Sequence, residues 1–310
     1  NEQAKALVAQ QKATWEMADK NYHGLSRIQT RTFNFDFFKI QVQFNPERIR
    51  SSAAKTDAKS IAERPCFLCL KNLLPEQKGI PFKDDYLILT NPFPIFPLHL
   101  TIPHLEHTPQ RIHDFFGDML DLSRELSDFT VFYNGPQTGA SAPDHFHFQA
   151  GNNGLLPIEK EYTTLLNNYA EILLHNNDLT VFSVTNYLRR FIAVQSANSA
   201  VIQNIFHRIF ELLPAETGKE PLLNILCTYK NGAWQVIIFP REKQRPSHFY
   251  REGEERIVVG PASVELGGVL ILPRFDDFEK INQKTIEEIY DEVTIGKEVF
   301  LQIQQRIKSF

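Results

Sequence analysis

Cysteine and long apolar runs are both scarce in this chain of 310 residues. Its three cysteines are too few for the disulfide framework of a small secreted domain, so the fold must depend on an ordinary hydrophobic core. No run of about 18 apolar residues is present, and residues 1–20 are polar and helix-like, without the apolar centre of a signal peptide. These absences argue against a transmembrane helix, and we interpret the protein as cytoplasmic.

An excess of charge of either sign is also missing. The formal net charge of −4 argues against a nucleic-acid coat or a polybasic membrane anchor, so any phosphate must be bound in a local basic pocket. Hydrophobic residues make up 42% of the chain and charged residues 23%, as in an ordinary soluble globular protein. The length suits one large domain or two domains of ordinary size.

The most informative stretch is the hexapeptide Asp-His-Phe-His-Phe-Gln at residues 144–149. In a β-strand, successive side chains point to opposite faces, so His145, His147 and Gln149 line one face and the two phenylalanines line the other. The preceding residues 134–143 are rich in small and turn-forming residues, which lets a ligand approach backbone amides closely. The pattern indicates a nucleotide site; the alternative is a pair of partly buried strand histidines with satisfied ring nitrogens.

A second motif is Arg-Pro-Cys-Phe-Leu-Cys at residues 64–69. Two cysteines in the spacing C-x2-C can clamp one zinc ion through their thiolates, and a closed structural site needs two more ligands. The missing ligands should be histidines. A redox pair or two plain core cysteines are the competing interpretations.

Two loops, one before the cysteine pair and one between the two motifs, are candidates for substrate binding. Residues 45–55 contain three cations and two hydroxyls, and arginine suits phosphate because its fork can bind two oxygens at once. Residues 91–97, Asn-Pro-Phe-Pro-Ile-Phe-Pro, form a rigid extended connection because each proline restricts itself and its predecessor. The first loop, considered alone, is equally compatible with a solvated surface.

Hydrophobic periodicity and turn residues predict a mixed order of helices and strands. In the first half we expect a helix over 2–19, two short strands or a hairpin over 33–44, strands at 86–90, 98–103 and 129–133, and a helix opened by Thr108 and Pro109 that ends near 126. After a boundary at 151–154 we expect strands near 179–184, 190–194, 222–229, 234–239, 256–259 and 269–272, a helix near 199–213, and mainly helix over 277–307. The second half thus repeats a similar order of elements, without a second His-x-His.

Taken together, these motifs resemble the galactose-1-phosphate uridylyltransferase-like branch of the histidine-triad superfamily. The branch also includes diadenosine tetraphosphate phosphorylases and GDP-hexose phosphorylases, and the chain is similar to a bacterial family, common in Bacteroidetes, with the same two blocks at 64–69 and 91–97. The matching motifs span residues 45–149. The resemblance implies an α+β fold of two histidine-triad-like halves, each an antiparallel sheet with packed helices: a catalytic half, 1–150, and a degenerate second half, 151–310.

The resemblance also implies roles for single residues. It makes His147 the nucleophile that forms a nucleotidyl-histidine, and Gln149 its phosphate-binding neighbour. It implies a structural zinc ion held by Cys66, Cys69, His107 and His145. We choose His107 as the third ligand because it directly precedes Thr108 and Pro109; His104 is a close rival and His99 a weaker one. The expected substrate-binding residues are Asn134, Gly135, Ser141, Arg48, Arg50, Phe93 and Phe96, although core packing is an equal alternative for the two phenylalanines.

The function implied by this resemblance is that of a nucleotidylyltransferase or phosphorylase. Its substrate would be a nucleoside diphosphate sugar or a dinucleoside polyphosphate, its acceptor phosphate or a sugar phosphate, and its assembly a monomer or homodimer. Glutamine at 149, where small histidine-triad hydrolases have histidine, favours transfer over hydrolysis; a hydrolase and a nucleotide-binding regulator are the alternatives. A basic cluster of Arg241, Lys243, Arg245 and His248 either helps to hold the substrate or, as we favour, forms a solvated face.

Overall fold

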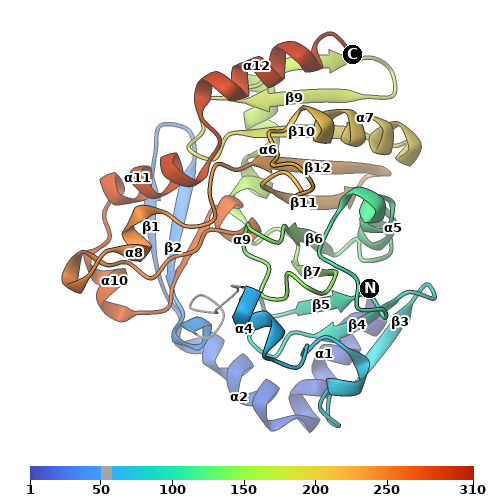
Figure 1. The fold of residues 1–310 in the computed structure, drawn as a ribbon, viewed down its shortest axis with the longest axis vertical. Helices are drawn as coiled ribbons and strands as arrows, with labels where there is room; N and C mark the ends of the chain where they lie inside the picture. Colours follow the sequence, from blue (N-terminus) through green and yellow to red (C-terminus); the bar gives the residue numbers. More distant parts are fainter. Residues whose placement is uncertain (50–57) are drawn as a thin grey trace.

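The computed structural model describes residues 1–49 and 58–310, so the predicted phosphate ligand Arg50 lies outside the described residues. A ten-stranded antiparallel sheet forms the centre of the protein, in the order β3-β4-β5-β7-β6-β11-β12-β10-β9-β8 (Figure 1). Its strands are β3 (Gly79–Phe82), β4 (Tyr86–Thr90), β5 (His99–Pro103), β6 (Phe129–Asn134), β7 (His147–Asn152), β8 (Glu171–His175), β9 (Thr180–Val184), β10 (Phe191–Ser196), β11 (Leu223–Lys230) and β12 (Ala233–Pro240).

This sheet contains the same five-stranded unit twice. In each unit the fifth strand in sequence lies between the third and the fourth, and a helix connects the third strand to the fourth: α5 (Phe116–Glu125) and α7 (Ser199–Leu212). The two fourth strands, β6 and β11, pair antiparallel and join the units edge to edge. The prediction of two α+β halves with antiparallel sheets is therefore confirmed, and the structure adds that the halves share one continuous sheet.

Alternating side chains give the large sheet two different faces. One face packs on α1 (Glu2–Thr14), α5, α7 and α12 (Lys297–Ile307), and it receives both phenylalanines of the central motif. The other face packs on α6 (Pro157–Asn168), α11 (Gln283–Val293) and a small sheet of β1 (Gln29–Asn34), β2 (Lys39–Phe44) and β13 (Val269–Leu272). In Figure 1 the β1–β2 hairpin and α11 lie to the left of the large sheet, and α5 and α7 to its right.

The small sheet connects sequence positions that are far apart. The predicted hairpin over 33–44 is present as β1 and β2, and β2 pairs in parallel with β13, with Val42 opposite Leu270. Residues 29–44 therefore contact an element of the second half of the chain, although they belong to the first half. The division of the chain into domains 1–150 and 151–310 stays a prediction.

Several predicted boundaries are wrong. The amino-terminal helix is broken by the buried, extended Trp15 into α1 and α2 (Glu16–Gly24). The central helix does not start at Thr108 but at Phe116, after the 3-10 turn η4 (His113–Phe115), because the Thr108 carbonyl accepts from Phe146 and the Gln110 N–H donates to Pro143.

The strand expected at 256–259 is also wrong. The N–H of Ile257 donates to the His248 carbonyl and that of Val258 to the side chain of Asp277, so these residues pair with no neighbouring strand. In the central motif, β7 begins at His147 rather than at residue 144.

The remaining helices of the described chain are short and lie around the sheets. They are α4 (Ala58–Ala62), α8 (Ser247–Tyr250), α9 (Ser263–Leu266), α10 (Phe275–Lys280) and the 3-10 turns η1 (Leu25–Arg27), η2 (Pro46–Arg48), η3 (Leu70–Asn72) and η5 (Gly253–Glu255). None of the helices in the described ranges is both long enough and apolar enough to cross a membrane.

Candidate active site and metal centre

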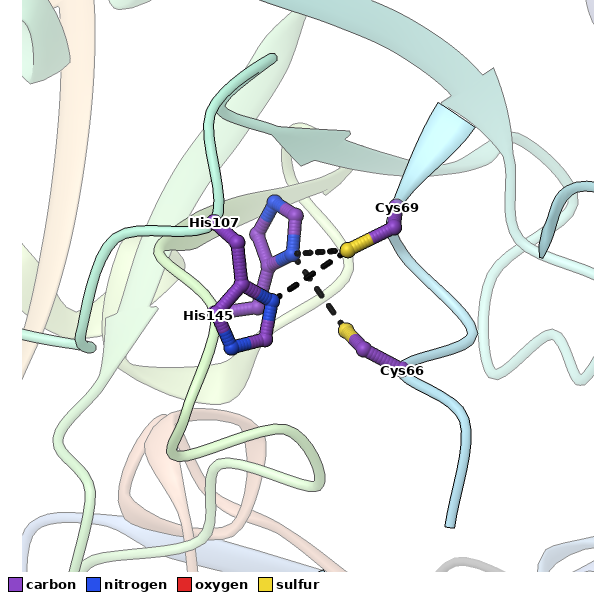
Figure 2. A group of neighbouring side chains, drawn as sticks. All are labelled: Cys66, Cys69, His107 and His145. Atoms are coloured by element: carbon purple, nitrogen blue, oxygen red, sulfur yellow. Dashed lines mark hydrogen bonds between the residues drawn. The ribbon is translucent and has the colours of Figure 1, made fainter. Parts of the chain in front are cut away.

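The side chains of two cysteines and two histidines meet in the first half of the chain. Cys66 and Cys69 come from the loop before η3, His107 follows β5, and His145 precedes β7; their ligand atoms all lie within 4.8 Å of one another. The His145 Nδ1 atom is 3.3 Å from the Cys66 Sγ, and the His107 Nδ1 atom is 3.2 Å from the Cys69 Sγ. Figure 2 shows both sulfur atoms directed at the two imidazole rings.

Hydrogen bonds orient these rings for metal binding. The Nε2–H of His145 donates to the carbonyl of His104 at 2.7 Å, so its Nδ1 carries the lone pair that faces the sulfurs. Burial lowers the pKa of His145, which favours the neutral ring that a metal ligand requires. The Nε2 of His107 lies 3.7 Å from a carboxylate oxygen of Asp144, whose other oxygen accepts from Arg64. Two thiols and two oriented imidazoles match a closed tetrahedral zinc site.

The two rival histidines lie outside this cluster. His104 accepts the N–H of Glu106 at its Nδ1, and its ring packs edge-on against Tyr86. Its contribution to the cluster is its backbone carbonyl. His99 binds Gln149 instead, so the structure places His107 and neither rival beside the cysteines.

His147 opens β7 on the face opposite the two phenylalanines. Its Nδ1–H donates to the carbonyl of His145 at 2.8 Å, so the lone pair resides on Nε2. The residue is 3% exposed, and burial lowers its pKa to about 4. A neutral imidazole with a free Nε2 lone pair is a competent nucleophile.

Gln110 supports this histidine from the segment between β5 and α5. Its side-chain oxygen accepts the N–H of His147 at 2.8 Å, and its NH₂ group donates to the carbonyls of His147 and Asn134. The single side chain thus joins the start of β7 to the end of β6. The sequence alone indicates no role for Gln110, because Thr108 and Pro109 predict the first turn of a helix at this position.

A histidine on β5 sets the orientation of Gln149. The N–H of Ile95 donates to the Nδ1 of His99, which places the His99 proton on Nε2, and this Nε2–H donates to the Gln149 side-chain oxygen at 3.1 Å. Burial, together with the nearby Arg48 cation, lowers the pKa of His99 to about 3, so it stays neutral. Because its oxygen is bound to His99, Gln149 presents its NH₂ group as a donor. A histidine at the start of the β5 sequence was the only signal for this role.

The loop after β6 is closely packed against the second half. A Cβ atom on Gly135 would lie 2.7 Å from the Thr138 hydroxyl, and Gly139, at φ +113°, leaves no room for a Cβ beside Ala262. The Asn134 oxygen accepts from Asn224 and from the N–H of Ser263, each at 2.9 Å. The carbonyl of Ser141 accepts from Arg64. A cleft of about 210 Å³ opens beside this loop, lined in part by Gln110, Arg111, Lys219 and Glu220.

Arg48 and the residues of the 91–97 connection lie near His99. The Arg48 guanidinium donates to the carbonyl of Phe93, and burial lowers its pKa to about 10, so it stays charged near neutral pH. Phe96 is 3% exposed and its ring packs edge-on against His99, in space that a side chain on Gly151 would fill. Phe93 is partly buried, whereas Phe96 is part of the core and supports His99.

The basic cluster after β12 is only in part a solvated face. Arg241 is buried and donates to carbonyls of Val293, Pro261 and Lys243 and to the side chain of Asn224. His248 is also buried and lies 3.2 Å from Glu288, whereas Lys243, which is exposed and lies 3.0 Å from Glu292, and Arg245, which stacks on Phe249, are nearer the surface. The prediction of a solvated face is wrong for Arg241, because its acceptors come from segments far apart in the sequence.

Comparisons with known proteins agree with this fold. A family model described as "GDPGP1-like, C-terminal domain" matches residues 157–310, and a domain of unknown function (DUF4922) matches residues 7–152. The crystal structure of yeast Ap4A phosphorylase Apa2 is similar with a TM-score of 0.61 and 14% identity, covering 90% of this chain and 96% of that chain. The two family models thus match the two halves of the chain in turn, and the whole chain shares the fold of Ap4A phosphorylase Apa2.

Two further structures of yeast Ap4A phosphorylase Apa2 contain nucleotides. The complex with Ap4A has a TM-score of 0.62 and 15% identity and covers 94% of this chain and 97% of that chain. The complex with AMP has a TM-score of 0.56 and 15% identity and covers 93% and 96%, respectively. No curated protein matches the sequence. In the second five-stranded unit, β12 is the counterpart of β7 and contains no histidine.

Proposed function

We propose that this protein is a nucleotidyl-transferring enzyme, a nucleotidylyltransferase or phosphorylase, that acts on a nucleoside diphosphate sugar or a dinucleoside polyphosphate through His147. The observation that carries the proposal is the pair of oriented side chains on β7. His147 directs an unprotonated Nε2 away from its own backbone, and two residues later Gln149 directs an amide donor from the same face. A nucleophile beside a non-titrating phosphate donor is suited to covalent nucleotidyl transfer.

The chemistry divides one displacement into two. In the first step the Nε2 lone pair forms a bond to the α-phosphorus, and the bond from phosphorus to the bridging oxygen breaks, so the leaving phosphate departs with the electron pair. The ring then carries a positive charge, which the bond from Nδ1–H to the His145 carbonyl stabilises. In the second step an oxygen of phosphate or of a sugar phosphate attacks the same phosphorus and breaks its bond to nitrogen.

Donors around His147 would stabilise the charge on the phosphoryl oxygens. We assign this role to the NH₂ groups of Gln149 and Asn134 and to the backbone of the loop at Gly135 and Ser141, with the Arg48 cation nearby. Such prearranged donors are the main catalytic resource of phosphoryl-type transfer besides the nucleophile. The nucleotides in the Apa2 complexes, Ap4A and AMP, support the dinucleoside polyphosphate class as a substrate.

We further propose that Cys66, Cys69, His107 and His145 hold one zinc ion. With four protein ligands its role would be structural, since no coordination position stays open for water. The ligands would tie the loop at 66–69 to the end of β5 and to the residues just before His147. Two neighbouring cysteines used as metal ligands and not as a disulfide are typical of a reducing compartment, which supports the cytoplasmic assignment. Elemental analysis of protein purified without chelator should find one zinc per chain, and a metal-free preparation would contradict this assignment.

The test of the main proposal is intact-protein mass spectrometry after brief incubation with nucleotide sugars and diadenosine polyphosphates, without acceptor. The wild-type protein should gain the mass of one nucleoside monophosphate, and His147→Ala should gain none. His175→Ala, which removes a ring from the exposed end of β8, is the matched control and should react as wild type. An adduct on His147→Ala would refute the assignment of His147 as the nucleophile. Release of free monophosphate at a rate independent of added phosphate would identify a hydrolase instead.

A further inference from the structure

The two halves meet directly beside the proposed catalytic site. At the junction between β6 and β11, Asn134 lies opposite Asn224, and the side chains of these two residues are hydrogen-bonded. Asn224 is completely buried, and its amide also donates to the carbonyl of Thr138 in the loop after β6. A residue of the second half therefore contacts both the end of β6 and the loop that follows it.

The direction of these hydrogen bonds is determined by Arg241. Its guanidinium can only donate, and its N–H groups bind four backbone carbonyls and the side-chain oxygen of Asn224. The Asn224 oxygen must therefore face Arg241, and its NH₂ group must face Asn134. An exchange of oxygen and nitrogen in Asn224 would bring two donors together at the buried arginine.

The same argument determines the orientation of Asn134. Its side-chain oxygen accepts from Asn224 and from the N–H of Ser263, so its NH₂ group points away from both. Among the described residues no acceptor binds this NH₂ group. Asn134 is adjacent to His147, since one Gln110 NH₂ group donates to the backbone carbonyls of both residues. The amide thus presents an unused donor next to the nucleophile.

We infer that Asn224 and Arg241 are positioning residues of the active site: they hold the Asn134 amide with its NH₂ group directed at a phosphoryl oxygen of the substrate. The inference rests on the proposed function and assigns a role to the second half, which contains no nucleophile in β12. It also gives a reason for the hydrogen bond from the buried Arg241 to Asn224, whose amide in turn donates to Asn134 and to the loop after β6.

The decisive variant is Asn224→Asp. A carboxylate at this position still accepts from Arg241, and the ion pair compensates its burial, but it has no donor for Asn134. The Asn134 amide should then rotate to donate to the carboxylate and turn its oxygen towards the substrate. Loss of one hydrogen bond to a charged group predicts that adduct formation slows by about 10-fold or more, with weaker binding of AMP, GMP or UMP. Asn198→Asp, the same change at the cap of α7, where a carboxylate accepts equally well, should react as wild type.

A double-mutant cycle separates positioning from a general structural role. Asn134→Ala alone should slow adduct formation as much as Asn224→Asp does, and Asn224→Asp in the Asn134→Ala background should add no further loss. Melting curves identify an Asn224→Asp protein that does not fold. In that case Arg241→Gln is the second variant, because glutamine offers both donor and acceptor and releases Asn224; it should slow adduct formation in the same direction.

The outcomes distinguish the two levels of the argument. If the wild type forms the adduct and folded Asn224→Asp forms it at the same rate, the positioning role is overturned and the proposed function stays intact. The same holds if the rate losses of the two single variants multiply in the double variant. A wild-type protein that forms no adduct and binds none of the three monophosphates by calorimetry would overturn the proposed function, and the inference with it.

Discussion

Replacing Glu220 by glutamine should change how the stability of the protein depends on pH. Glu220 precedes β11 and accepts hydrogen bonds from the Tyr133 hydroxyl at 2.7 Å and from the N–H of Ile112 at 2.6 Å. Burial raises the pKa of this carboxyl to about 7, against the opposing effect of these bonds and of the Arg111 and His113 charges. The site lies beside the loop after β6, since a Cβ on Gly135 would be 3.3 Å from the Glu220 carboxylate.

The magnitude follows from the displacement of this pKa. A change from the ordinary 4.5 to about 7 corresponds to about 3 kcal/mol, of which about 2 kcal/mol falls between pH 5.5 and 8. The folded protein binds the proton more tightly than the unfolded chain does. The free energy of unfolding should therefore decrease as pH rises from about 4.5 to about 7 and show no further contribution from Glu220 above that range.

Denaturant unfolding of wild type and Glu220→Gln at pH 5.5 and at pH 8 measures this contribution. The stability of Glu220→Gln relative to wild type should rise by about 2 kcal/mol between the two pH values, because glutamine does not ionise. Glu216→Gln, four residues earlier and paired with Lys219 at the surface, is the matched control and should show little change. A difference between wild type and Glu220→Gln that does not vary with pH would refute the burial argument.

Three further predictions follow from the site. Cys66→Ser should lower the zinc content measured by elemental analysis and reduce the melting temperature by at least about 5 °C, since metal binding contributes folding energy; an unchanged zinc content would contradict the ligand assignment. Gln149→Glu should slow adduct formation at least about 100-fold because it removes a donor and adds a negative charge; rapid adduct formation would remove Gln149 from the site. Gly139→Ala should cost about 1–3 kcal/mol in denaturant unfolding because of its positive φ and the contact with Ala262, whereas Gly296→Ala, which meets nothing within 4 Å, should cost little.

Local patterns predicted the elements that carry the chemistry. The strand at 86–90 is present with the predicted limits, and the period-two alternation in the central motif places both phenylalanines in the core and His147 and Gln149 on the opposite face. The four residues selected as metal ligands are the ones that the structure brings together. These predictions needed only the side-chain direction of a strand, the spacing of two cysteines and a resemblance carried by short motifs.

Predictions failed where distant groups compete for the backbone. Thr108 and Pro109 have the sequence of a helix start. However, the Thr108 carbonyl accepts from the N–H of Phe146, and the Gln110 N–H donates to the carbonyl of Pro143. The Ile112 N–H donates to Glu220. The apolar residues 257–259 are buried without strand partners, since the N–H groups of Ile257 and Val258 bind His248 and Asp277. Burial and alternation alone do not distinguish such a segment from a strand.

The sequence by itself determined which residues of a single strand share one face, because the alternation of side chains depends only on their positions along that strand. Only the tertiary structure decided that β6 and β11 join two units into one sheet, and that His99 and Gln110 orient Gln149 and His147. It also decided that Arg241 determines the direction of the Asn134 amide. Each of these results depends on hydrogen bonds between residues separated by tens of positions, and a donor finds its acceptor only when the folded chain brings the two together.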